Sequence, residues 1–263
     1  MSTPRPDPGF SQSIERGLAI LSSFKPTRPL IGVSELAREV ELGRSTTHRY
    51  VATLKSLGYL EQDPVTRKYR LGPRVIDLGF SAINSMELRA ISAPYLQRLS
   101  DETGYTANMS ILDDTDIIYI ERCRSAKKGP REIELDLHVG SRLPAYCTAM
   151  GKVLLAYLPD EDRDARLDRV QLKPHGPNTV TDRAALVAEL EEVRATGIAV
   201  NNEEITYGIR AIAAPVRGRS GNVVAAVGFG VHRSWMRMQD LVRELTPILQ
   251  STAAEISART GYH

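Results

Sequence analysis

The chain has 263 residues, of which 42% are apolar, and a formal net charge of +2 at pH 7. This length allows one or two substantial hydrophobic cores, so we expect two domains. The sequence contains no run of eighteen apolar residues, and the opening MSTPRPDPGFSQS has no continuous hydrophobic stretch. We therefore expect neither a membrane span nor a signal peptide, and we expect a cytoplasmic location with Cys123 and Cys147 as buried, reduced thiols.

Positive charge is concentrated near the N-terminus. Residues 11–75 contain eleven Lys or Arg and six Asp or Glu, whereas the whole chain has 34 basic and 32 acidic residues. The rest of the chain therefore carries a net negative charge. A basic module attached to an acidic body predicts that a negatively charged partner such as DNA binds at one end of the chain.

A flexible, proline-rich arm is expected at residues 1–12, followed by a first domain at residues 13–73. The first helix of this domain is predicted at residues 13–24. The side chains that its spacing directs toward the core are Ile14, Leu18, Leu21 and Phe24.

Residues 33–71 follow the element order of a winged helix-turn-helix. Ser34 is placed to cap one helix, Leu42-Gly43 interrupts the pattern at a turn, and Ser45 is placed to cap a second helix. The second helix is predicted to end at Gly58. Its core-facing positions are Thr47, Val51, Leu54 and Leu57. This order of elements predicts a DNA-binding protein.

The polar side of the second helix is predicted to enter the major groove of double-stranded operator DNA. The residues assigned to base and phosphate contacts are Arg44, Ser45, Thr46, His48, Arg49 and Lys55. Strands at residues 59–62 and 68–71, joined by a turn at Asp63-Pro64, would form the wing. Arg67 and Lys68 at its tip are predicted to lie beside phosphates.

A linker region is expected at residues 74–92. Its first part, residues 74–84 (RVIDLGFSAIN), has helical spacing and more apolar surface than a free linker would expose. We expect this helix to pack on a partner subunit. A second helix, at residues 88–103, should end at Gly104.

The second domain is expected to span residues 93–263 and to be an α+β domain of the GAF or PAS kind, with an antiparallel sheet that encloses a ligand. The predicted strands are residues 105–112, 116–123, 131–139, 198–200, 209–216 and 223–231. The predicted helices are residues 148–157, residues 182–196 capped by Thr181, and a final helix capped by Ser234 that ends near Arg259.

The chain resembles the IclR family of bacterial transcription regulators over essentially its whole length. The first domain carries the resemblance in SIERGLAIL, GRSTTHRYVATLKSLGYLE and RKYRLGPRVIDLG, and the second in VGSRLPAYCTAMGKVLLAYLP and YGIRAIAAPV. The segment RLPAYCTAMGKVLLA is most similar to the PcaR, PcaU and PobR branch, which regulates aromatic-acid catabolism. The resemblance implies a homodimer or tetramer in which a small-molecule effector controls occupancy of the operator. A pair of recognition helices also reads more sequence than one alone.

The resemblance further implies an effector pocket. The positions that match family members binding small carboxylic acids are Ala149, Met150, Asn201, Ala211, Gly228 and Gly230. Ala and Gly at these positions favour a larger and less polar effector, such as an aromatic acid or an extended dicarboxylic acid of the β-ketoadipate type. The candidates for binding its carboxylate are Arg142, Arg124 and the start of the helix at Thr148.

Alternative functions have weaker support. Cys147 with His138, Arg142 and Lys152 offers a nucleophilic enzyme site, but a catalytic thiol needs a neighbouring base and an electropositive setting, which the spacing does not predict. The dispersed histidines His48, His138, His175, His232 and His263 do not predict a metal site. A ligand-independent architectural DNA-binding protein is the remaining alternative, although it would not require so large a second domain.

No cofactor fingerprint is present. The segment AMGK resembles part of a phosphate-binding loop, but Tyr146 stands where that loop needs Gly and Val153 where it needs Ser or Thr. The segment GFG at residues 228–230 lacks the third glycine of a dinucleotide site. The sequence leaves open the effector, the target genes, the operator sequence, and whether the protein represses or activates. An activator would have RNA polymerase as a further partner.

Overall fold

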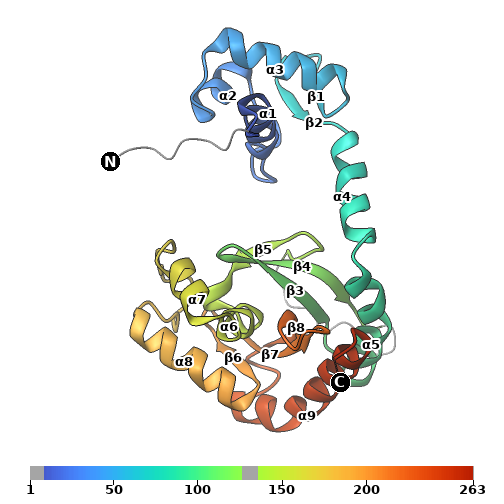
Figure 1. Ribbon diagram of the computed structural model, residues 1–263, viewed down its shortest axis with the longest axis vertical. Helices are drawn as coiled ribbons and strands as arrows, with labels where there is room; N and C mark the ends of the chain where they lie inside the picture. Colours follow the sequence, from blue (N-terminus) through green and yellow to red (C-terminus); the bar gives the residue numbers. More distant parts are fainter. Residues whose placement is uncertain (1–8, 126–135, 263) are drawn as a thin grey trace. The chain divides into compact units, whose positions relative to one another are not determined.

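The structure is a computed structural model that describes residues 9–125 and 136–262 (Figure 1). The chain divides into two compact units, Met1–Ser85 and Met86–His263. The predicted arm at residues 1–12 lies mostly outside the described residues. Within the described part of the chain, every helix is too short or too polar to cross a membrane.

The first unit has the element order of a winged helix-turn-helix followed by one more helix. The elements are α1 (Gln12–Ser22), α2 (Val33–Glu39), α3 (Arg44–Ser56), β1 (Leu60–Gln62), β2 (Tyr69–Leu71) and α4 (Arg74–Asn84). Strands β1 and β2 pair antiparallel, with Leu60 opposite Leu71. The hydrophobic core of the first unit consists of Ile20, Phe24, Ile31, Leu36, Val51, Leu60 and Tyr69.

Several local predictions for this unit are wrong. Ile14 and Leu18 are exposed, whereas Leu21 packs against the core and Phe24 is buried in it, as predicted; Ile20 is buried as well. Leu57 at the end of α3 is also exposed. Neither Ser34 nor Ser45 caps a helix: α2 begins after Gly32, whose backbone N–H donates to the Glu35 carboxylate, and α3 begins after Gly43.

The second unit is an antiparallel sheet covered by helices on both faces. Among the described residues, its strands are β3 (Ala107–Asp113), β4 (Asp116–Cys123), β5 (Arg142–Pro144), β6 (Ala199–Asn202), β7 (Ile209–Arg217) and β8 (Val223–His232). They run in the order β5-β4-β3-β8-β7-β6. The helices are α5 (Glu87–Thr103), α6 (Ala149–Ala156), α7 (Asp160–Leu167), α8 (Arg183–Thr196) and α9 (Met238–Arg259).

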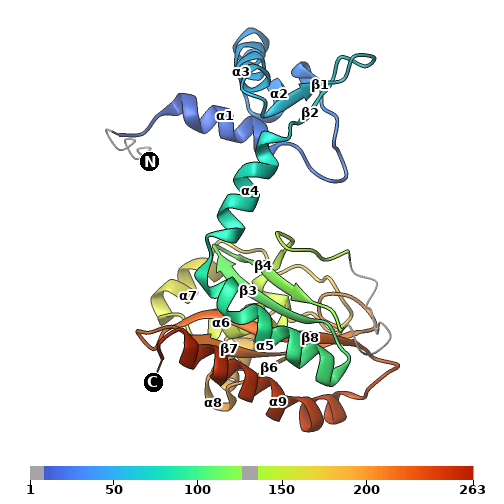
Figure 2. The same ribbon diagram turned by 90° about the vertical axis from the view of Figure 1, so that its right-hand side faces the viewer.

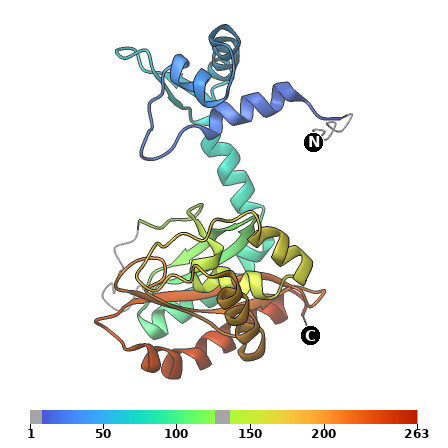
Figure 3. The ribbon, with the colours of Figure 1, turned by 90° about the vertical axis from the view of Figure 1, so that its left-hand side faces the viewer.

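The sheet separates two hydrophobic cores. One core joins α5 and α9 to residues such as Ile212 and Val227, and Figures 2 and 3 show α9 running along this face. The other joins α6 and α8 to Ala213 and Ala226. Successive residues of one strand point to opposite faces, so β7 and β8 contribute to both cores. The fold is therefore α+β with an antiparallel sheet, as the sequence predicts.

The helix boundaries of this unit follow the sequence closely, with some exceptions. Gly104 and Gly197 end α5 and α8 in the left-handed conformation that glycine favours. Asp182, not Thr181, caps α8 by accepting from the backbone N–H of Ala185 at 2.8 Å. Helix α9 begins after Arg237 instead of Ser234, and α7 was not predicted.

The strand predicted at residues 131–139 is not observed as such. Residues 131–135 lie outside the described residues, and residues 136–139 form no strand. The edge position beside β4 is instead occupied by β5, where Ile118 is opposite Arg142. The prediction is therefore wrong for residues 136–139 and lies outside the described residues for the rest of the segment.

Candidate functional site

The exposed side of α3 is the candidate DNA-binding surface of the first unit. Arg44, Ser45, His48 and Arg49 are exposed and Thr46 is partly exposed, whereas Thr47 and Val51 on the opposite side are fully buried. Burial of one helix face fixes the other toward solvent. Lys55 is also exposed, and its Nζ donates to Oε1 of Gln62 in the wing at 3.4 Å.

The wing is closed by its own hydrogen bonds. The Asp63 carboxylate accepts from the backbone N–H groups of Val65 at 3.1 Å and Thr66 at 2.6 Å. These hydrogen bonds hold the pKa of Asp63 below its ordinary value, with the Thr66 backbone making the largest contribution. Arg67 follows in the left-handed region, with φ of 59°, and its side chain is exposed.

The two cations of the wing have different surroundings. Nζ of Lys68 lies 3.6 Å from Oε1 of Glu35 on α2, whereas no ion pair is recorded for Arg67 within the described ranges. The pKa of Glu35 is lowered first by the hydrogen bond from the Gly32 backbone and then by Lys68. Of the two predicted phosphate-binding residues of the wing, Lys68 thus already has an acidic neighbour within the first unit.

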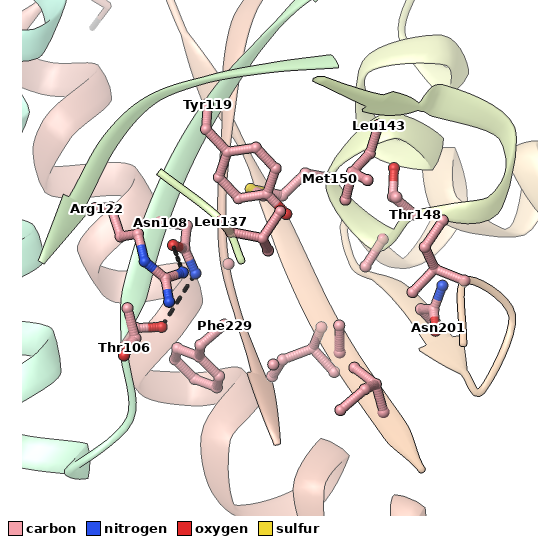
Figure 4. Close-up of a pocket in the computed structure, with 17 residues that line it drawn as sticks. Thr106, Asn108, Tyr119, Arg122, Leu137, Leu143, Thr148, Met150, Asn201 and Phe229 are labelled. Carbon is pink, nitrogen blue, oxygen red and sulfur yellow. Dashed lines mark hydrogen bonds between the residues drawn. The ribbon is translucent and has the colours of Figure 1, made fainter. Parts of the chain in front are cut away.

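The second unit contains a partly open cavity between the sheet and the start of α6 (Figure 4). The space inside it is about 680 Å³, counting the open mouth. Six residues assigned to the effector pocket line it: Ala149, Met150, Asn201, Ala211, Gly228 and Gly230. The structure thus brings together side chains from α6, β6, β7 and β8.

Arg142 is not among the described residues that line the cavity. It lies on the edge strand β5, is 44% exposed, and has Nη2 2.7 Å from Oδ2 of Asp113 and Nε 3.4 Å from Oδ2 of Asp116. Arg124 is exposed and does not line the cavity either. The structure thus argues against both arginines as carboxylate partners, because their positions face solvent.

Arg122 is the cavity-lining cation that the sequence reasoning missed. Its Nη1 donates to Oδ1 of Asn108 at 2.9 Å, and Nδ2 of Asn108 donates to the Thr106 carbonyl at 3.2 Å (Figure 4). Asn108 is only 6% exposed. It therefore holds one side of the guanidinium in place. Of the described residues that line the cavity, Arg122 is the one with a formal charge at neutral pH.

The other polar side chains among the described residues that line the cavity are neutral. Burial raises the pKa of Tyr119 to about 12, so its phenol stays protonated. Thr148 caps α6 by accepting from the Gly151 backbone N–H at 3.2 Å. Asn201 is 1% exposed; its amide donates to the Cys147 carbonyl and accepts from the Glu204 backbone N–H. These two bonds use one of the two N–H donors and one of the two acceptor sites of the Asn201 amide.

Gly228 has a structural reason to be glycine. A Cβ at this position would lie 2.4 Å from the carbonyl oxygen of Ile212 on the neighbouring strand β7. The close approach of the two strands therefore requires glycine, whatever the size of the ligand. This corrects the interpretation that Gly228 is small in order to enlarge the pocket.

The surroundings of Cys147 do not activate a nucleophile. Burial raises the pKa of Cys147 to about 12, and a further increase comes from the negative charge of Glu204. The two residues predicted to assist Cys147 make other contacts. Lys152 forms ion pairs with Glu204 and Glu189. The backbone N–H of His138 donates to the hydroxyl of Ser141. A catalytic thiol requires the opposite shift in pKa. The described residues also contain no group of three potential metal ligands.

Two features define the class of protein. A winged helix-turn-helix with an exposed basic helix, and a separate α+β unit with a largely apolar cavity, together describe a DNA-binding regulator that senses a small molecule. The model of the IclR helix-turn-helix domain matches residues 13–64, and the model of the C-terminal domain of the bacterial transcriptional regulator IclR matches residues 80–258. The chain belongs to the IclR family of bacterial transcriptional regulators.

The similar proteins include transcription regulators and a structure solved with 4-hydroxybenzoate. The chain is 36% identical to the Pca regulon regulatory protein of Pseudomonas putida, covering 95% of this chain and 84% of that protein. It is 30% identical to the p-hydroxybenzoate hydroxylase transcriptional activator of Acinetobacter baylyi, covering 94% and 91%. An IclR homologue from Microbacterium hydrocarbonoxydans, solved with 4-hydroxybenzoate, is 26% identical with a TM-score of 0.78, covering 95% and 99%.

Proposed function

We propose that the protein binds operator DNA through α3 and the wing, and that an aromatic carboxylic acid in the cavity controls this binding. The observation that carries the proposal is Arg122, the one charged side chain among the described residues that line the cavity, where its neighbours include the apolar Met150 and Phe229. A carboxylate would pair with the guanidinium while the ring packs on the apolar wall. The relatives named above support the aromatic class.

An extended dicarboxylic acid of the β-ketoadipate type is the second candidate. It would place one carboxylate at Arg122 and the other among neutral groups such as Thr148 and Tyr119. A desolvated carboxylate without a partner cation is costly. The described part of the cavity wall therefore favours an acid with one carboxylate over an acid with two.

The proposal for DNA assigns base contacts to the N-terminal half of α3. Arg49 is exposed there and has no ion pair among the described residues. The Arg49→Ala variant should lose about 1 to 3 kcal/mol of operator affinity if the guanidinium donates to a base edge. The loss should depend on one operator position. Unchanged affinity on both the operator and a single-base variant would remove Arg49 from the assignment.

We further propose that the protein is cytoplasmic, where its operator DNA lies. It would act as a homodimer or tetramer, because two recognition helices are needed to read paired half-sites. If it activates transcription, RNA polymerase becomes a further partner. Titration of the purified protein on its operator with 4-hydroxybenzoate, 3,4-dihydroxybenzoate and adipate tests the effector class. A shift in operator affinity with either aromatic acid supports the proposal, and a response to adipate alone would favour the dicarboxylic class.

A further inference from the structure

Strand β4 presents the cavity cation on one face of the sheet and its neighbours in the chain on the other. The side chain of Arg122 lines the cavity (Figure 4). Cys123 belongs to the hydrophobic core that joins α5 and α9 to the opposite face. Successive residues of a strand point to opposite faces, so Glu121 shares the face of Cys123. The residues on both sides of Arg122 therefore face away from the cavity.

The carboxylate of Glu121 joins the backbone of Arg122 to helix α5. Its Oε1 accepts from the backbone N–H of Arg122 at 3.0 Å. Its Oε2 lies 2.9 Å from Nε of Arg89 on α5, and the side chains of Glu121 and Arg89 are 11% and 30% exposed. Salt screens a partly buried ion pair less than one on the surface. One carboxylate thus links the strand segment that carries the cavity cation to a helix outside the cavity.

Two further contacts join the end of β4 to the same helix. Nε2 of Gln97 donates to the carbonyl oxygen of Arg124 at 3.0 Å. Sγ of Cys123 donates to the carbonyl oxygen of Ala93 at 3.8 Å. Both contacts involve residues that follow Arg122 in the chain. A displacement of β4 at Arg122 therefore acts on α5 at several points.

Helix α5 is the element of the second unit that the chain connects to the DNA-binding unit. It is the next helix after α4, and the boundary between the two units falls between Ser85 and Met86. Arg89 lies in the first turn of α5, near this boundary. A change in the position of Arg89 is therefore a change at the start of the second unit.

We propose that the ion pair between Glu121 and Arg89 transmits effector binding from Arg122 to α5, an inference that rests on the function proposed above. The carboxylate of the acid pairs with the guanidinium of Arg122. The backbone of Arg122 then adjusts, and Glu121 carries the adjustment to Arg89. The acid changes operator affinity because it binds more tightly to the state in which this contact is shifted.

Operator titrations of the full-length protein, with and without saturating 4-hydroxybenzoate, test the proposal. The ratio of the two operator affinities measures the coupling, which typically amounts to about 5- to 150-fold. Arg89→Gln and Glu121→Gln should each bring this ratio to within about twofold of one, because either change removes the ion pair. Arg89→Lys keeps the charge and should restore part of the response.

The affinity for the acid should change little in the Arg89→Gln variant. Arg89 is not among the described residues that line the cavity. Calorimetry on the protein without DNA should therefore give an acid affinity within about threefold of wild type. Thermal unfolding shows whether each variant is folded. If Glu121→Gln does not fold, the more exposed Arg89 provides the deciding variant.

Arg98→Gln is the matched control. Arg98 lies on the same helix, and its Nη2 is 2.6 Å from Oε2 of Glu255 on α9. The substitution removes one arginine ion pair from α5 without removing a contact to β4, so the ratio should equal that of wild type. An equal decrease for Arg98→Gln and Arg89→Gln would overturn the proposal, because any loosening of α5 would then have the same effect.

Two further results overturn the proposal, and they differ from failure of the proposed function. In the first, Arg89→Gln responds to the acid as wild type does. In the second, it binds the acid more than about tenfold more weakly but keeps the wild-type ratio at saturation, so that the ion pair only positions Arg122. If wild type itself does not bind the acid, or binds it without a change in operator affinity, the proposed function fails and this inference falls with it.

Discussion

Asn108 holds the guanidinium of Arg122 at the wall of the cavity. Among the described residues of that wall, no other charged side chain is available to bind an anion. Replacing Arg122 with Gln keeps a polar side chain but removes the charge. Hydrogen bonds to charged groups contribute about 1.5 to 3 kcal/mol, so Arg122→Gln should weaken binding of an aromatic acid about tenfold to a hundredfold. Calorimetry with 4-hydroxybenzoate measures the change.

Arg142→Gln provides the control for this prediction. Arg142 is an exposed ion-pair partner of Asp113 and Asp116, so its loss should leave acid affinity within about twofold, since exposed ion pairs contribute little. A large effect of Arg142→Gln together with no effect of Arg122→Gln would reverse the assignment and restore the expectation from the sequence.

The sequence reasoning did not find Arg122 among the residues that line the cavity, and there is a physical reason. Strict alternation along a strand puts residues 120 and 122 on one face, yet Arg122 lines the cavity together with Tyr119, three positions earlier. A register shift between Met109 and Ser110 on β3 leaves one extra residue on β4. Such a bulge changes which side chains face the ligand. The six predicted lining residues lie on α6, β6, β7 and β8, which this bulge does not affect.

The wing is expected to contact phosphates mainly through Arg67. The ion pair between Lys68 and Glu35 must be loosened or shared before Lys68 can neutralise a phosphate. Arg67→Ala should reduce the slope of log affinity against log salt by about one unit, and Lys68→Ala by less. Binding measured over a series of salt concentrations separates the two variants. Equal slopes for both variants and wild type would show that the wing does not touch DNA.

Helix α4 buries none of its residues within the chain. Ile76 is 58% exposed and Phe80 is 61% exposed, and their spacing of four places them on one side of the helix. Apolar surface of this kind usually marks an interface. Phe80→Glu should therefore weaken self-association, lowering the mass observed by sedimentation at micromolar concentration.

Ser81→Glu adds the same charge to α4 on a different side of the helix and should leave the mass unchanged. If Phe80→Glu has the same mass as wild type at every concentration, α4 does not mediate association. This test also bears on the DNA-binding proposal, because paired half-sites require a paired protein.

Prediction of the elements succeeded where local chemistry decides the structure. Glycines at 104 and 197 end helices because they adopt positive φ, and Thr148 caps α6 with its own hydroxyl. It failed where packing between distant segments decides. Ile14 and Leu18 of α1 stay exposed although they share the helical spacing of Leu21, and β5 pairs with β4 at the edge of the sheet although no strand was predicted there. Neither choice is visible in a local pattern.

Regulation requires that the effector distinguish between states of the whole molecule, because a ligand that binds two states equally shifts neither. The DNA-binding elements and the cavity belong to different compact units. A variant that blocks the cavity should therefore separate the two activities. Gly230 is suitable, since it lines the cavity and lies opposite Ala211 on β7.

Gly230→Leu should abolish binding of the aromatic acid while operator affinity without the acid stays within about twofold of wild type, because the added side chain fills space that the ligand needs. Gly230→Ala serves as the control for backbone effects and should weaken acid binding less. Calorimetry and operator titration, each with and without 4-hydroxybenzoate, report the two activities separately. If Gly230→Leu binds the acid as tightly as wild type, the cavity is not the effector site. If Gly230→Leu loses operator affinity in the absence of the acid, then a change in the second unit alters DNA binding by the first, and the variant does not separate the two activities.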